Sequence, residues 1–298
     1  MQKPSNLKPS DKVVILSTAR KISEAEIAPA VQVFEDWGLT VVLGANLHQE
    51  DHQFSGTTAQ RVSDLQLAMD DESVKAIFCA RGGYGTVKII DALDFSTFQK
   101  RPKWIVGYSD VTVLHNHINQ SFSIETLHAT MPINFLTHSK ESEESLKKVL
   151  FGEALSYEFG SHQLNRCGTA TGEMVGGNLS ILYSLTGTNS QVDTNGRILF
   201  IEDLDEYLYH IDRMLMNLKR AGILSRLTGL VVGGMSAMND NAIPYGKTAK
   251  EIILEAVSDF DYPVCFDFPA GHLADNRALI MGRKVTLKVA ESCSLKFT

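Results

Sequence analysis

The first half of the chain alternates short apolar runs with amphipathic stretches, and this rhythm restricts the folds it can adopt. The apolar runs cover residues 12–19, 40–45, 74–80 and 104–108. Helical patterns separate them, one opening with a Ser23 to Glu26 capping box and ending near Gly38, another at residues 58–70. Strands that alternate with helices predict a parallel sheet with helices on both faces. We therefore expect an α/β protein with a doubly wound, mostly parallel N-terminal sheet.

The sequence pattern changes after a polar helix predicted at residues 139–151. Shorter strands and more glycines follow, and a domain boundary is expected between Gly152 and Gly168. We predict an N-terminal domain at residues 1–155, a linker at 156–164 and a second α/β domain at 165–298. Its expected elements are strands at 197–201, 229–233, 263–268 and 284–289 and a helix at 206–221.

Composition excludes several classes of function. The formal net charge of −7 argues against a nucleic-acid surface, which needs clustered basic residues. The apolar run 13–19 is closed by Arg20 and is too short for a signal peptide or a membrane span. The four cysteines are far apart and form no Cys-x-x-Cys pair. We expect a cytoplasmic protein with reduced thiols, no metal site, no cofactor and no membrane or nucleic-acid partner.

Ser109 lies where an apolar strand stops and a helical pattern begins. This is the local design of a nucleophile elbow, a tight turn that exposes a hydroxyl at the carboxyl end of a strand. Gly107 relieves crowding in the turn, and the amide of Asp110 is a free donor of the helix N-terminus. Val111 stands where the Gly-x-Ser-x-Gly motif has its second glycine. The alternative is that Ser109 caps the following helix.

A glycine-rich loop, Arg81-Gly82-Gly83-Tyr84-Gly85, follows the strand at 74–80. Lys88 stands where a dinucleotide fingerprint needs its third glycine, and no Gly-Lys-Ser/Thr follows, so neither nucleotide motif is present. The loop suits an oxyanion hole with one amide from the loop and one from Asp110. The alternative is a turn that simply requires positive φ angles.

Acids cluster after the apolar run that ends at Ile201. Glu202 is the first polar residue there, so it is expected at the carboxyl end of a strand, where it could orient a histidine. Asp203, Asp205 and Glu206 are expected to solvate the turn or to favour the start of the next helix. A metal site built from these acids is a weaker alternative, because the spacing is not that of a calcium loop.

A Gly271-His272 pair ends the apolar run at 263–268, and His272 is the candidate general base. The chain has nine histidines, and His128, which follows another strand, is the strongest rival. Spacing alone does not pair Ser109 with His272. The order Ser, Glu, His is one that known triads use.

Taken together, these motifs resemble those of the LD-carboxypeptidases. The resemblance runs from Lys12 to about Val289 and rests on five segments in the family's order. These are Arg81-Gly82-Gly83-Tyr84-Gly85, Gly107-Tyr108-Ser109-Asp110-Val111-Thr112, Gly176-Gly177-Asn178-Leu179, Phe200-Ile201-Glu202-Asp203 and Gly271-His272. The resemblance implies a triad of Ser109, Glu202 and His272 divided between two domains. It also implies an oxyanion hole formed by the backbone amides of Gly83 and Asp110.

The resemblance also implies a murein tetrapeptide as substrate, cut to release its terminal D-alanine, and a cytoplasmic homodimer. Arg81 is our candidate for the terminal carboxylate, because arginine binds carboxylates bidentately. Gly82 and Asn178 are further candidates for substrate binding. Two alternatives stay open: a microcin C immunity-type peptidase that cleaves aminoacyl-nucleotide conjugates, and a non-catalytic protein whose two domains close around a small ligand.

Overall fold

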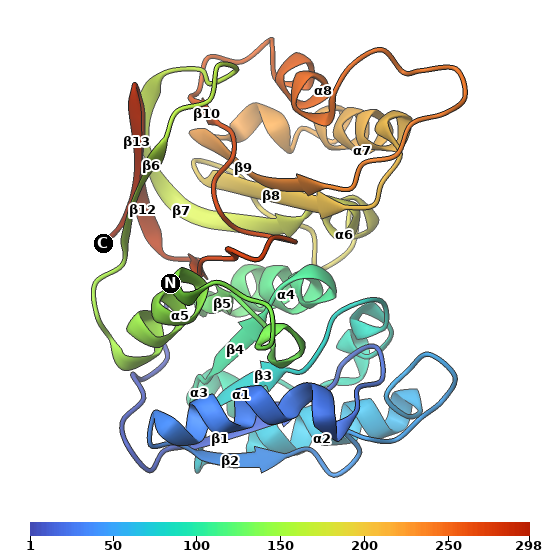
Figure 1. Cartoon of the computed structure of the whole chain (residues 1–298), viewed down its shortest axis with the longest axis vertical. Helices are drawn as coiled ribbons and strands as arrows, with labels where there is room; N and C mark the ends of the chain where they lie inside the picture. Colours follow the sequence, from blue (N-terminus) through green and yellow to red (C-terminus); the bar gives the residue numbers. More distant parts are fainter.

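The computed structural model describes residues 1–298 and contains two β-sheets, one in each half of the chain (Figure 1). The first sheet has the order β11-β5-β4-β3-β1-β2. Its parallel strands are β1 (Lys12–Leu16), β2 (Thr40–Leu43), β3 (Val74–Cys79), β4 (Trp104–Gly107) and β5 (Thr126–His128). The order β2-β1-β3-β4-β5 is a doubly wound topology, so the predicted fold class is confirmed.

Helices cover both faces of this sheet, as expected. The helices are α1 (Glu24–Asp36), α2 (Thr58–Asp70), α3 (Ser96–Lys100), α4 (Thr112–Phe122) and α5 (Lys140–Phe151). Val13 and Ile15 of β1 share a core with α1 and α5, whereas Val14 and Leu16 share a separate core with α2, α3 and α4. Alternate side chains of a strand point to opposite faces, so the continuous apolar run of β1 supplies both cores.

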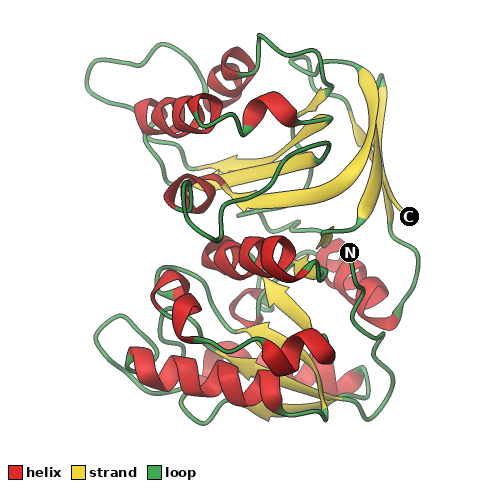
Figure 2. Ribbon diagram, turned by 180° about the vertical axis from the view of Figure 1, so that it is seen from behind, coloured by secondary structure: helices red, strands yellow, loops and turns green.

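The second sheet has the order β10-β9-β8-β7-β12-β13-β6. The strands β7 (Gly168–Asn178), β8 (Ile198–Leu204), β9 (Gly229–Ser236) and β10 (Val264–Cys265) are parallel. The strands β12 (Lys284–Val289), β13 (Ser292–Phe297) and β6 (Ser156–Gly160) are antiparallel. The helices α6 (Leu179–Ser184), α7 (Leu208–Arg220) and α8 (Ala249–Ala256) share a core with one face of this sheet and lie beside its strands in the upper half of Figure 2.

Short 3-10 turns complete the fold. They cover Thr86–Lys88, Ile90–Ala92, Ser109–Val111, Pro132–Asn134 and Leu224–Arg226. None of the helices combines the length and the apolar character that crossing a membrane requires.

Two segments tie the halves of the chain together. The residues predicted as a linker contain β6, which is the edge strand of the second sheet and pairs with β13. In the other direction β11 (Leu279–Met281), from the second half, pairs antiparallel with β5 of the first sheet. Each sheet therefore includes a strand from outside the residue range predicted for its domain.

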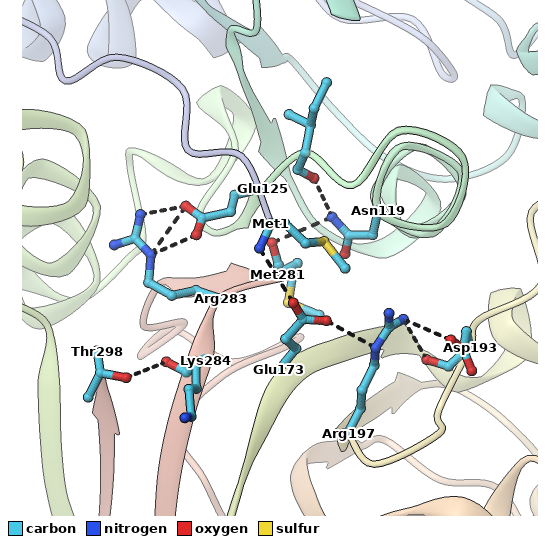
Figure 3. A network of polar contacts seen from close by, with 11 residues as sticks. Met1, Asn119, Glu125, Glu173, Asp193, Arg197, Met281, Arg283, Lys284 and Thr298 are labelled. Atoms are coloured by element: carbon cyan, nitrogen blue, oxygen red, sulfur yellow. Dashed lines mark hydrogen bonds and ion pairs between the residues drawn. The ribbon is translucent and has the colours of Figure 1, made fainter.

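Polar contacts reinforce the join around β11 (Figure 3). Arg283 donates from Nε to Glu125 Oε1 over 3.0 Å, and the Asn119 amide donates to the Met281 carbonyl over 3.5 Å. Helix α4 lies between the two sheets and contacts β7 (Figure 1). One continuous apolar core includes residues of both sheets, so the carboxyl ends of β3, β4, β7 and β8 are held in a fixed relation.

Candidate active site

Ser109 lies in a sharp turn directly after β4. Its φ is +62°, a left-handed conformation that costs a non-glycine residue energy and is common at functional sites. At Gly107 (φ +157°) a Cβ would come within 2.8 Å of the Val111 side chain. The helix-capping alternative is wrong: α4 begins only at Thr112, and the Ser109 side chain makes no capping hydrogen bond. Its hydroxyl is exposed by the elbow instead.

The glycine loop lies against this hydroxyl group. A Cβ on Gly82 would be 3.0 Å from Ser109 Cβ and 3.2 Å from its Oγ. Gly83 has a φ of +111°, and its amide donates to no group of the protein. The two amides predicted for an oxyanion hole, those of Gly83 and Asp110, therefore belong to segments that flank Ser109.

The side chain of Asp110 fastens these two segments together, a role that the sequence analysis missed. The carboxylate is 1% exposed, and its Oδ2 accepts a hydrogen bond of 2.8 Å from the Thr86 amide at the end of the glycine loop. Burial raises the pKa of Asp110, although the Thr86 contacts and the Arg61 charge oppose that effect. An acid directly after the predicted nucleophile was the available signal.

Glu202 and His272 meet Ser109 across the two halves of the chain. Glu202 lies within β8, which continues to Leu204, and is fully buried. His272 follows β10 in a loop, where its Nδ1 is 2.6 Å and its backbone amide 3.2 Å from Glu202 Oε2. Its Nε2 is 3.2 Å from Ser109 Oγ. At Gly271 (φ +105°) a Cβ would lie 2.7 Å from the Glu202 side chain, so only glycine permits this approach.

The surroundings of His272 favour its charged form. Burial lowers the pKa of His272, but the hydrogen bond and charge of Glu202, with the charge of Asp203, outweigh burial and raise it above its ordinary value. The Tyr108 ring packs edge-on against the imidazole at 4.9 Å. Burial beside Glu202 raises the pKa of this phenol to about 12, so Tyr108 stays neutral.

The rival histidines have other environments. His128 is fully buried behind Tyr108 and Phe200, and neither of its ring nitrogens has a hydrogen-bond partner. Burial lowers the pKa of His128 well below its ordinary range. His115 is also buried and is bonded to the Gly107 carbonyl at 2.8 Å, so it supports the elbow from beneath.

The expectation that Asp203 solvates a turn is wrong. Asp203 is buried and accepts hydrogen bonds from the Asn178 side-chain amide at 3.0 Å and from the Ser180 and Leu204 amides at 2.9 Å. Burial and the Glu202 charge raise the pKa of Asp203 to about 7. Asn178, a predicted substrate-binding residue, also caps α6 by accepting from the Ile181 amide.

The remaining acids are placed separately. Asp205 is exposed and accepts from the Asn239 amide at 2.8 Å, whereas Glu206 is 2.6 Å from His210 one helical turn away. No group of three or more His, Cys, Asp and Glu side chains is arranged to hold a metal ion. The acids after Ile201 thus serve different local contacts.

Ser109 and His272 open into a cavity of about 440 Å³ between the two halves. Its lining includes Gly82, Gly83, Asn178 and Arg81 among the predicted residues, and Asp203 and Asp205 on the side of the second sheet. Arg81 is engaged on the surface, with Nη1 3.7 Å from Glu26 Oε1 and 3.4 Å from the Lys21 carbonyl. A second arginine, Arg20, also lines the cavity. In the sequence, Arg20 stands out only as the residue that closes the apolar run 13–19.

Comparison with known proteins assigns the chain to a family. Residues 13–129 match the LD-carboxypeptidase N-terminal domain, and residues 171–287 match the LD-carboxypeptidase C-terminal domain. A Bacillus subtilis (strain 168) protein named probable murein peptide carboxypeptidase is 35% identical over 98% of this chain and 93% of its own length.

Solved structures show the same fold. The muramoyltetrapeptide carboxypeptidase of Oxalobacter formigenes superimposes with a TM-score of 0.87 at 24% identity, covering 96% of this chain and 98% of that one. The microcin C7 self immunity protein MccF superimposes with a TM-score of 0.88 at 20% identity, covering 100% and 98%. With both of its domains matched and a full-length relative above 30% identity, this chain belongs to the LD-carboxypeptidase family.

Proposed function

We propose that this protein is a serine LD-carboxypeptidase that releases the terminal D-alanine from murein tetrapeptides. The observation that carries the proposal is the continuous chain of hydrogen bonds from Ser109 Oγ through His272 to the buried Glu202, at the wall of a cavity large enough for a peptide end. The full-length relative named as a probable murein peptide carboxypeptidase supports the choice of substrate.

The proposed reaction begins when His272 Nε2 takes the proton of Ser109 as the hydroxyl oxygen attacks the carbonyl carbon before D-alanine. Glu202 accepts from Nδ1, which fixes the tautomer and stabilises the imidazolium that forms. The amides of Gly83 and Asp110 donate to the oxyanion. His272 then protonates the departing amine, which leaves an ester on Ser109.

Water completes the cycle. His272, neutral again, removes a proton from a water molecule that attacks the ester carbonyl, and the shortened peptide leaves as Ser109 recovers its proton. The proposal includes a cytoplasmic location and a homodimeric assembly, both of which rest on the family resemblance.

The Ser109→Ala variant tests the role of the hydroxyl. We expect turnover of a purified tetrapeptide to fall by roughly 10⁴-fold or more, because no other group forms the ester. Titration calorimetry should show that the variant still binds the peptide. Ser180→Ala, at another serine of the same cavity, is the matched control and should keep most of the turnover. A Ser109→Ala variant that retains full function would instead favour the non-catalytic binding protein.

A substrate panel separates the proposed activity from the immunity-type alternative. Mass spectrometry of wild-type reactions should detect the loss of one alanine from a murein tetrapeptide. An aminoacyl-nucleotide conjugate offered in parallel should be cleaved much more slowly. Faster cleavage of the conjugate would contradict the murein assignment.

A further inference from the structure

Arg20 is anchored beside the glycine loop of the active site. It follows β1, where the Ser17 hydroxyl donates to the Arg20 carbonyl over 2.7 Å and Arg20 pairs antiparallel with Phe54. These contacts fix the backbone from which the side chain extends. The carboxyl end of β1 is also next to the strand-order reversal of the sheet, a common position for ligand binding in doubly wound folds.

The side chain of Arg20 crosses Gly83 and reaches into the cavity. Any Cβ on Gly83 would overlap the Arg20 Cγ and Cδ atoms, while a Cβ on the preceding Gly82 would touch Ser109. The order across the cavity wall is therefore Ser109, Gly82, Gly83, Arg20. Gly82 and Gly83 are consecutive residues, and consecutive Cα atoms are about 3.8 Å apart. The Arg20 side chain therefore contacts the residue next to the one that contacts Ser109.

The guanidinium of Arg20 has no partner within the chain. It forms neither an ion pair nor a side-chain hydrogen bond, although the neighbouring Lys21 pairs with Glu50 at 2.6 Å and Arg81 contacts Glu26. Arg20 and Arg81 are the two arginines of the cavity lining, and of these two Arg20 is the unpaired one. An arginine in this state is available to bind an anion through two parallel hydrogen bonds.

The acidic and basic side chains of the cavity lie on different walls. Asp203 and Asp205 line the wall on the side of the second sheet, whereas Arg20 and Arg81 line the wall formed by the first. A carboxylate is repelled by the acidic wall and attracted to the basic one. In a peptide cut by a carboxypeptidase, only the amide nitrogen and one α-carbon separate the scissile carbonyl from the terminal carboxylate. This separation suits a carbonyl at Ser109 and a carboxylate beyond Gly83.

We propose that Arg20 binds the free carboxylate of the residue that is released, and so restricts the enzyme to chain ends. This assignment rests on the proposed function. It also differs from the sequence-based choice of Arg81, whose guanidinium is partly engaged by Glu26 and the Lys21 carbonyl.

The test compares two peptides that differ only at the end, one with a terminal D-alanine carboxylate and one with the D-alanine amide. The wild-type protein should prefer the carboxylate. In Arg20→Met, kcat/KM for the carboxylate should fall by roughly 30-fold or more, because the two parallel hydrogen bonds of the charged pair are lost, while kcat/KM for the amide stays within about threefold. Arg20→Lys should recover part of the preference, since it keeps the charge but not the bidentate geometry.

Further variants make the result specific. Lys21→Met removes an adjacent cation outside the cavity and should leave the carboxylate-to-amide ratio unchanged. If Arg81→Met abolishes the preference and Arg20→Met does not, Arg81 is the carboxylate ligand and the assignment is overturned. An equal loss on both peptides in Arg20→Met overturns it as well, because that is the signature of a structural role. If the wild-type protein cleaves neither peptide, the proposed function fails and the assignment of Arg20 fails with it.

Discussion

The left-handed backbone of Ser109 shows how single residues are strained to build the site. A serine at φ +62° is retained because its surroundings over-determine the turn: His115 binds the Gly107 carbonyl, and Asp110 binds the Thr86 amide. In the second half of the chain, Gly271 also has a left-handed backbone conformation, and a side chain there would displace Glu202. Strand, glycine and serine were recognisable in the sequence as an elbow. The buried partners that hold the elbow were not.

At the same scale, the raised pKa of His272 predicts the pH dependence of activity. In the proposed mechanism His272 must be neutral to act as the base, so kcat/KM should rise with pH through a value above the ordinary histidine pKa. Asp203→Asn removes a negative charge that raises this pKa, so the acidic limb of the profile should move to lower pH. Asp205→Asn, which is outside the causes of the shift, is the control and should leave the limb in place. An unmoved limb in Asp203→Asn would contradict this electrostatic account.

Among the elements, α4 and β7 connect the proposed nucleophile, Ser109, to the proposed triad acid, Glu202. Thr112, the first residue of α4, is fully buried, and its Oγ1 accepts a hydrogen bond of 3.0 Å from the Asn178 amide at the end of β7. Gly177 (φ +137°) leaves no room for a Cβ beside the Thr112 side chain. Asn178 is paired in register with Glu202 of the neighbouring strand β8. The contact between helix and strand therefore sets how far Ser109 lies from Glu202.

Removing the hydroxyl of Thr112 should weaken this connection. Thr112→Val keeps the shape but leaves the buried Asn178 amide without its acceptor, so the free energy of unfolding should fall by about 1–3 kcal/mol. Thr112→Ser, which keeps the hydroxyl, is the matched comparison. Urea unfolding should give a lower midpoint for the valine variant with an unchanged slope. Equal stability of the two variants would show that the hydrogen bond contributes little.

The bounds of the helices and strands show how much of the secondary structure local sequence patterns predict. The helix predicted at residues 58–70 and the strand at 284–289 are confirmed as α2 and β12, because amphipathic periodicity and clear turn residues bound both. The strand predicted at 197–201 is longer, since β8 continues through Glu202 and Asp203. Two acids within a buried strand contradict the local pattern. They are tolerated there because Asn178, Ser180 and His272 supply hydrogen bonds.

In the whole molecule, the exchange of strands makes the two halves one unit. The strand β11 completes the first sheet, and the adjoining Arg283 pairs with Glu125, which is almost fully buried. The shared apolar core includes Phe78 of the first sheet and Phe200 of the second. Because the proposed active site takes Ser109 from one half and His272 from the other, the join keeps these two groups within hydrogen-bonding distance.

Breaking the join should destabilise both halves together. Arg283→Met strands the Glu125 carboxylate in a buried position, and we expect a loss of about 3 kcal/mol or more. Calorimetry should show one unfolding transition that moves to lower temperature. Lys284→Met, at an adjacent lysine without an ion pair, should change the transition temperature little. Two well-separated transitions in the wild-type protein would contradict the single unit.

The sequence by itself determined the alternation of strands and helices, and with it the parallel sheet and the sharp turn at Ser109. These features depend on the periodicity of apolar residues and on glycines a few positions away, which are local properties. It also supplied Glu202 and His272 as candidates, with the family resemblance to unite them. Only the tertiary structure decided that these three side chains share hydrogen bonds, that Asp203 is buried, and that Arg20 is left unpaired beside Gly83. Such facts depend on residues up to 163 positions apart along the chain, and no pattern within a short window encodes which distant groups pack together.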